Sequence, residues 1–274
     1  MLEAAAFASK LLLYAATLGG VGASLHRAMG ITLNRRVFVW LGGAVAVTAL
    51  LRLLVVNAQM GGALTAAFSA DHFQWMWAGI GNQTTAFLAG AALLFVSAYS
   101  ASRISAIAAA LAIAGGFALA GHSAGLEIPG PAPYVVALHT LIAGFWFAAP
   151  WTLWPRASEA GDLTLHRTRM FTRIAIIVVP AIFVSGLWLL WRIGGGIDGV
   201  ISSLYGRLLL GKLALGAAIL GLGALNMTVV TKKLAAAPAS GRKALRATLR
   251  IDAVLFLGVL LLIASATSFT GPNE

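Results

Sequence analysis

Eight apolar stretches run through this sequence, and each is long enough to cross a lipid bilayer. Roughly 20 helical residues span a hydrocarbon core about 30 Å thick. The chain is 60% hydrophobic and only 10% charged, which leaves too little polar surface to cover a soluble globule. We therefore expect one all-α membrane domain, residues 1–274, embedded in the lipid bilayer as a bundle of eight transmembrane helices. The expected spans are 5–26, 37–57, 74–100, 104–121, 133–154, 171–191, 204–231 and 245–270.

Basic residues gather in alternate connections between these stretches. The first, third, fifth and seventh connections hold fourteen of the 19 Lys and Arg residues, whereas 58–73 and 122–132 hold none. Cytoplasmic loops of membrane proteins carry such an excess, so we expect the basic loops in the cytoplasm and both termini outside it. Topology then accounts for the net charge of +11, and we expect no nucleic-acid partner. The fourteen residues are Arg27, Arg35, Arg36, Arg103, Arg156, Arg167, Arg169, Arg173, Lys232, Lys233, Arg242, Lys243, Arg246 and Arg250.

The chain contains no cysteine, which excludes disulfides, iron–sulfur clusters and thiolate metal sites. A site for a soft metal would therefore use His and Met. Imidazole and thioether suit copper, with Met favouring Cu(I). The expected topology places the candidate ligands at the outer ends of the helices, and they are Met60, His72, Met76, His122 and His139. The inner loops hold only His26 and His166, each near arginines that repel a cation.

Two of these candidates, His122 and His139, flank a short proline-rich loop that joins two expected helices. We expect their imidazoles to lie at a similar depth near the outer face and to bind copper together. Polar groups at membrane depth are costly and usually face a bundle interior, which favours a functional site. The alternative is that each is an ordinary hydrogen-bonding residue at a helix end. Packing is likewise the alternative for His72, Met60 and Met76.

Three charged side chains fall within the apolar stretches. At 1.5 Å per residue, Arg52 lies about 22 Å from the inner end of its helix, Lys212 about 12 Å from the outer end and Asp252 about 10 Å from the inner end. Lys212 and Asp252 are on consecutive helices, so an intramembrane ion pair is one interpretation. Separate snorkelling of each side chain to its nearer interface is the other.

Several motifs in the second half of the chain resemble a known family. Residues 139–146 read HTLIAGFW, and 205–212 read YGRLLLGK. These segments, with the Gly-His pair at 121–122 and the Leu-Asn pair at 225–226, resemble the copper resistance protein D family (CopD/PcoD). The motif residues besides the histidines are Trp146, Tyr205, Gly206, Arg207 and Asn226. The sequence departs from the family where Asp252 stands in place of an expected glutamate.

The resemblance implies a copper transport or resistance protein of the bacterial inner (plasma) membrane, which imports copper from the periplasm. It also implies a periplasmic copper carrier of the CopC type as partner. The sequence has no GxxxxGK[ST] phosphate loop, so we expect transport without ATP hydrolysis and no enzyme activity. Two alternatives stay open. Two histidines on adjacent helices could clamp a b-type haem in a redox protein, and an assembly factor could bind copper without moving it.

Overall fold

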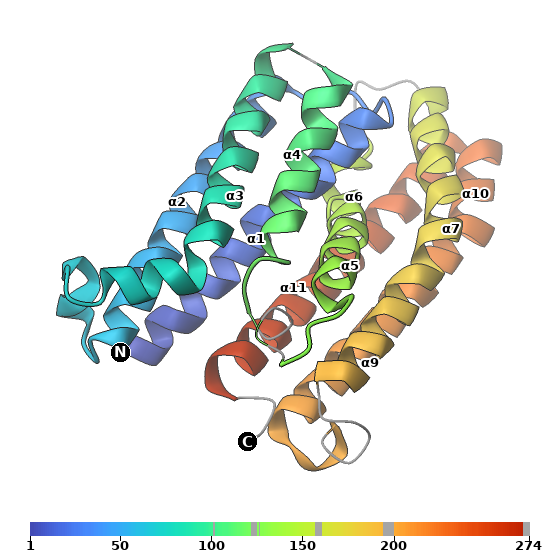
Figure 1. The fold of residues 1–274 in the computed structure, drawn as a ribbon. Coiled ribbons are helices and arrows are strands. Elements are labelled where there is room, and N and C mark those ends of the chain that lie inside the picture. The colour runs from blue at the N-terminus through green and yellow to red at the C-terminus, as the bar shows by residue number, and fades with distance from the viewer. Residues whose placement is uncertain (101, 122–124, 126, 157–160, 194–199, 271–274) are drawn as a thin grey trace.

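The fold is a bundle of long helices that run nearly side by side (Figure 1). The structure is a computed structural model, and it describes residues 1–100, 102–121, 125, 127–156, 161–193 and 200–270. The elements are α1 Leu2–Ala28, α2 Arg35–Met60, the 3₁₀-helix η1 Leu64–Phe68, α3 Phe73–Ser100, α4 Arg103–Gly116, α5 Ala132–Phe147, α6 Ala149–Thr152, α7 Gly161–Ile193, α9 Leu204–Leu225, the π-helix η2 Asn226–Val230, α10 Thr231–Ala236 and α11 Pro238–Phe269.

The all-helical membrane architecture expected from the sequence is confirmed for the described residues. Seven helical spans there are long and apolar enough to cross a membrane. The expected span at 104–121 is shorter than predicted, because α4 has 14 residues and ends at Gly116. At 1.5 Å per residue it is about 21 Å long, less than the full hydrocarbon thickness.

Two other expected spans are interrupted. The predicted helix 133–154 breaks between α5 and α6, where Pro150 supplies no backbone N–H. The predicted helix 204–231 is α-helical only as far as Leu225 and then continues as the π-helix at Asn226–Val230. A π-helical turn inside an α-helix is often found at functional sites.

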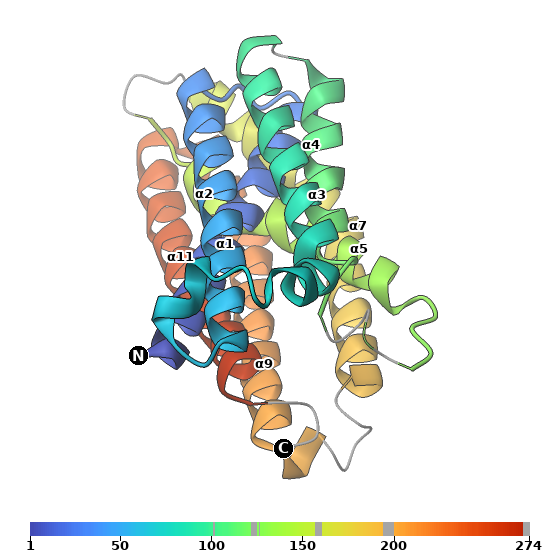
Figure 2. The same ribbon diagram turned by 60° about the vertical axis from the view of Figure 1, so that its left-hand side comes forward.

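Helix α1 packs against α2, α4, α5 and α11. Figure 1 shows α2 and α3 on one side of the bundle and α7, α9 and α10 on the other; the turned view in Figure 2 brings α2 and α3 to the front. The chain buries less of α7 and α9 than of the other long spans. These two helices touch each other far less than α7 touches α5 or α9 touches α11. The space that this leaves positions the candidate site.

The close crossing of α1 and α5 depends on glycine. A Cβ placed on Gly22 would lie 2.1 Å from the carbonyl oxygen of Gly144 and 2.4 Å from Cβ of Ala148. A Cβ on Gly144 would lie 2.8 Å from Cβ of Val21. Small residues let two helix backbones approach in this way. The crossing fixes α5 against the centre of the bundle.

Contacts between distant segments bring the basic connections to one end of the bundle. The Arg103 guanidinium lies 3.6 Å from the Cβ position of Gly30, which joins the connections after α1 and α3. Arg246 of α11 donates a 3.0 Å hydrogen bond to the carbonyl of Pro155, which joins α11 to the connection after α6. The start of α1 and the end of α11 lie together at the other end (Figure 1), where the Lys10 ammonium donates to the Thr267 carbonyl.

Candidate metal-binding cavity

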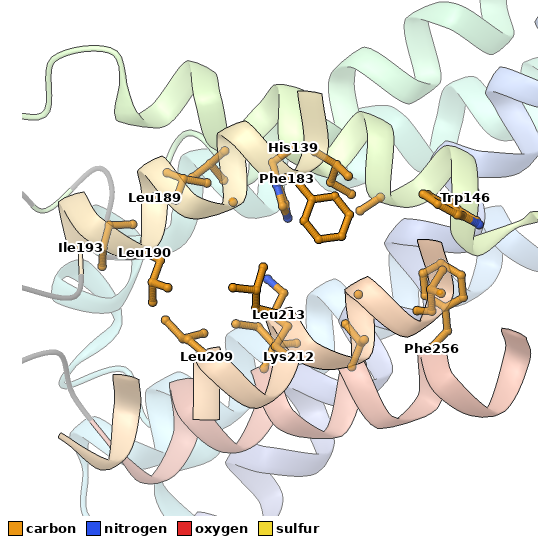
Figure 3. A pocket seen from close by; sticks show the side chains of 18 of the residues that line it. His139, Trp146, Phe183, Leu189, Leu190, Ile193, Leu209, Lys212, Leu213 and Phe256 are labelled. Carbon is orange, nitrogen blue, oxygen red and sulfur yellow. The ribbon is translucent and has the colours of Figure 1, made fainter. Parts of the chain in front are cut away.

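A cavity of about 270 Å³ lies between α5, α7, α9 and α11. Most of its wall is aliphatic or aromatic, and polar groups enter from His139, Tyr205 and Lys212. Figure 3 shows the imidazole of His139 and the amine end of Lys212 facing each other across the space, with Phe183 beside them. The cavity therefore presents two nitrogen groups within an apolar enclosure.

His139 is held against α7 by a hydrogen bond between its Nδ1 and Oγ of Ser185, at 3.0 Å. Ser185 also donates to the carbonyl oxygen of Ile182 at 3.1 Å. A carbonyl oxygen only accepts, so this second bond uses the single hydroxyl proton of Ser185. Nδ1 of His139 must then be the protonated ring nitrogen. Nε2 carries a lone pair and is free to bind a metal ion, an arrangement typical of histidine ligands.

The wall formed by α9 is fixed at its first turn. The Ser203 side chain caps this helix by accepting a 3.0 Å hydrogen bond from the backbone N–H of Gly206. Gly206 packs so closely on the preceding residues that an added Cβ would lie 2.1 Å from the Val200 carbonyl oxygen. Tyr205 is buried and lines the cavity, whereas Arg207 is exposed. Of the three YGR residues, Tyr205 therefore lines the cavity, and Gly206 packs against the preceding turn.

Trp146 forms the wall of the cavity farther along α5. It is buried and lies two turns beyond His139 on the same face. The Cβ position of Gly223 on α9 is 3.1 Å from Cζ2 of Trp146, so the absence of a side chain at Gly223 makes room for the indole ring. The His-x6-Trp spacing therefore places both side chains on one cavity.

The other predicted ligands are distributed differently. His122 lies outside the described residues, so the His122–His139 pair stays a prediction. His72 is half-buried beside Gly61, next to the exposed Met60 at the end of α2. Met76 is buried in the packing of α3. Across the described part of the chain, His, Asp and Glu residues form no group of three or more that could hold a metal ion.

His26 has a structural role. It is fully buried, with Nε2 2.9 Å from the carbonyl oxygen of Phe145 and Nδ1 2.7 Å from Oγ1 of Thr152. The carbonyl of Phe145 only accepts, so Nε2 carries a proton, while Nδ1 lies against the Thr152 hydroxyl, which also donates to the Ala148 carbonyl at 2.8 Å. Both ring nitrogens are therefore occupied, in contrast to His139.

Lys212 and Asp252 are separated along the bundle. Leu262 lies opposite Gly211, and Leu215 lies opposite Gly258, which sets the register of α9 against α11. In that register Lys212 lies at the level of residue 261, so Asp252 is nine residues, or roughly 14 Å, away along the helix axis. The interpretation of the two side chains as an ion pair is therefore wrong for this arrangement. Asp252 is buried, and its Oδ1 has no hydrogen-bond partner in the described part of the chain.

Two further residues singled out from the sequence belong to polar contacts between helices. Asn226 begins the π-helix and accepts a 2.6 Å hydrogen bond from the Thr248 hydroxyl through its Oδ1. Arg52 lies 3.4 Å from both the Ser9 hydroxyl and the Gln59 amide oxygen. Neither residue lines the cavity.

Sequence reasoning missed Ser185 and Phe183, which face His139 from α7. A signal for Ser185 was available, since it is a polar residue in the middle of an apolar helix. Its direction was not available, because the relative rotation of α5 and α7 depends on tertiary packing.

Comparison with known proteins identifies a family for part of the chain. Residues 165–266 match the family model described as CopD, copper resistance protein D. The match begins within α7 and ends within α11, so it includes Ser185, Tyr205 and Lys212 and leaves out His139. The family resemblance inferred from the motifs is confirmed. No curated protein and no solved structure matches the chain.

Proposed function

We propose, from the match of residues 165–266 to the family model of copper resistance protein D, that this chain is a copper transport protein of the bacterial inner (plasma) membrane rather than an enzyme. Copper is its substrate, taken from the periplasm and moved toward the cytoplasm without ATP hydrolysis. A periplasmic carrier of the CopC type delivers the ion. The long apolar helices support the membrane location.

In the proposed topology the chain crosses the membrane eight times and both termini face the periplasm. Helix α4 supplies the one crossing that is added to the seven long spans. Because α4 is short, either the bilayer thins around it or the flanking residues extend the span. The gathering of basic connections at one end supports this orientation, because positive charge is retained in the cytoplasm. The described termini lie at the opposite end.

Nε2 of His139 is the proposed copper ligand within the cavity. The observation that carries this assignment is the chain of hydrogen bonds from Nδ1 to Ser185 and from Ser185 to Ile182. It fixes Nδ1 as the protonated nitrogen of the neutral imidazole, whose Nε2 lone pair then faces the cavity. His122 is a second proposed ligand. Met60, His72 and Met76 are candidate ligands that contact copper at the outer face before it reaches the cavity.

The charge of the cavity favours Cu(I) over Cu(II) as the bound form. Lys212 enters the same space as His139, and the described lining contains no carboxylate. Coulomb repulsion from the ammonium is half as large for a single positive charge as for two. Imidazole and aromatic walls also suit the softer ion.

The test is copper uptake into proteoliposomes that contain the full chain, together with Cu(I) affinity measured by competition with a chromophoric chelator. His139→Gln removes the imidazole and is expected to lower Cu(I) affinity at least tenfold and to reduce uptake in proportion. His166→Gln is the matched control, because His166 is exposed near the start of α7, away from the cavity. It is expected to behave like the unaltered protein.

The same measurements separate the alternatives. Binding without uptake would identify a copper-binding assembly factor and contradict transport. A reduced Soret absorption band in the purified protein would identify a b-type haem protein. Equal Cu(I) affinity in the His139→Gln and His166→Gln variants would place the copper ligands elsewhere.

A further inference from the structure

The cavity between α5, α7, α9 and α11 combines an unusual size with an unusual charge. About 270 Å³ is on the order of nine water molecules at ~30 Å³ each. The walls are almost entirely apolar, and apolar cavities do not hold water of that amount. A single metal ion would leave most of this volume empty. A ligand that fills this cavity therefore needs a large apolar part.

The polar side chains that line the cavity indicate the chemistry of the ligand's polar end. Lys212 is half-buried at membrane depth, and it makes no hydrogen bond or ion pair with the residues that the structure describes. A polar or charged group in such surroundings is costly unless it is hydrogen-bonded. Across from it, His139 offers the lone pair of Nε2. Lys212 can donate a hydrogen bond and Nε2 of His139 can accept one. Together they fit a ligand group in which a hydrogen-bond acceptor stands next to an acidic proton.

We propose that this cavity binds a single-chain carboxylic acid of the fatty-acid class. One carboxyl oxygen accepts a hydrogen bond from the Lys212 ammonium, and the hydroxyl of the same carboxyl group donates a hydrogen bond to Nε2 of His139. The acyl chain lies along the aliphatic wall formed by residues such as Leu189, Leu190 and Leu209. No covalent bond is made or broken.

Depth favours a free acid over a membrane phospholipid. Lys212 lies eight residues, or about 12 Å, beyond Leu204 at the start of α9. A phospholipid phosphate lies at the membrane surface, whereas a carboxylic acid can enter the hydrocarbon region in its neutral form. The sparse contact between α7 and α9 gives the bilayer an approach to this part of the cavity.

This inference does not depend on the proposed copper function, although it bears on it. An acid bound at Nε2 would occupy the lone pair that copper needs, so the two ligands would compete for His139. Fatty acid would then inhibit copper binding at this site. Either ligand can fail its own test without deciding the other.

The experiment uses the full chain, purified in detergent and depleted of lipid, with oleic acid as the probe. Binding is measured by native mass spectrometry, and methyl oleate and dioleoylphosphatidylglycerol serve as comparison ligands. Oleic acid is expected to bind at least tenfold more tightly than its methyl ester, because the ester has no acidic proton to donate to Nε2 of His139. Equal binding of acid and ester, or tighter binding of the phospholipid, would overturn the proposal.

Substitutions at Lys212 give the second test. Lys212→Met is expected to weaken oleic acid binding tenfold or more, while Lys212→Arg keeps the charge and most of the affinity. Lys233→Met, at an exposed position outside the cavity, is the control. Gel filtration verifies that each variant is folded, and the comparison of acid with ester needs no variant. Undiminished oleic acid binding by a folded Lys212→Met protein would also overturn the proposal.

Discussion

Nδ1 of His139 lies 3.0 Å from Oγ of Ser185, and this contact joins α5 to α7 at the wall of the cavity. The Ser185 hydroxyl is itself directed to the Ile182 carbonyl. The pair therefore sets the tautomer of the imidazole as well as its orientation. A serine that touches no metal can in this way control whether a histidine is able to bind one.

Removal of this hydroxyl is the first prediction. Ser185→Ala takes away the acceptor for Nδ1–H, so the ring can rotate or change tautomer, and Cu(I) affinity is expected to fall about 10- to 100-fold. Thr172→Val is the matched control, because the Thr172 hydroxyl donates only to the backbone of its own helix, at Thr168. Chelator competition measures both variants. Identical Cu(I) affinity in the two variants would show that Ser185 does not support the ligand.

The second prediction concerns the glycine crossing of α1 and α5. Gly22→Ala would push a methyl group into the Gly144 carbonyl, and we expect it to lower the free energy of unfolding by about 1–3 kcal/mol or more. Gly43→Ala is the control, since nothing lies within 4 Å of its Cβ position. That substitution removes a flexible residue from α2 and is expected to be neutral or stabilising by up to ~1 kcal/mol. Unfolding in SDS, followed by circular dichroism, makes the comparison; equal stability of the two variants would contradict the crossing.

The third prediction follows from the register of α9 and α11. Residues without shared partners that lie more than about 7–10 Å apart contribute additively to stability. Lys212→Met and Asp252→Asn are therefore expected to change the free energy of unfolding independently, with a coupling below about 0.5 kcal/mol. A double-mutant cycle in SDS measures this coupling. A value of several kcal/mol would show that the two side chains are paired after all.

The sequence alone was sufficient for the class of fold and for most helix positions. Apolar length determines where a helix can cross a bilayer, and the connections rich in Lys and Arg differ in composition from the connections 58–73 and 122–132, which contain neither residue. The short α4 was not predicted, because residues 117–121 are as apolar or small as those before them. A hydropathy scale indicates that such residues are compatible with lipid, but it does not indicate the residue at which the helix ends.

The candidate site was predictable only in part. His139 and Trp146 were identified by spacing, since seven residues bring both to one helix face. The partner of His139 was expected on the helix before it, at His122, whereas the described contact is to Ser185 on the helix after it. The rotation of a helix about its axis is decided by its packing against other helices, such as that of Gly22 on Gly144. The sequence of the helix alone therefore does not predict which neighbour His139 contacts.

The lone pair on Nε2 of His139 is the centre of this account, and X-ray absorption at the copper K-edge observes its use directly. In the full chain loaded with one equivalent of Cu(I), imidazole scattering is expected, and His139→Gln is expected to reduce the number of imidazole ligands by one. His166→Gln should leave the spectrum unchanged. The same number of imidazole ligands in the His139→Gln protein as in the unaltered chain would contradict the assignment.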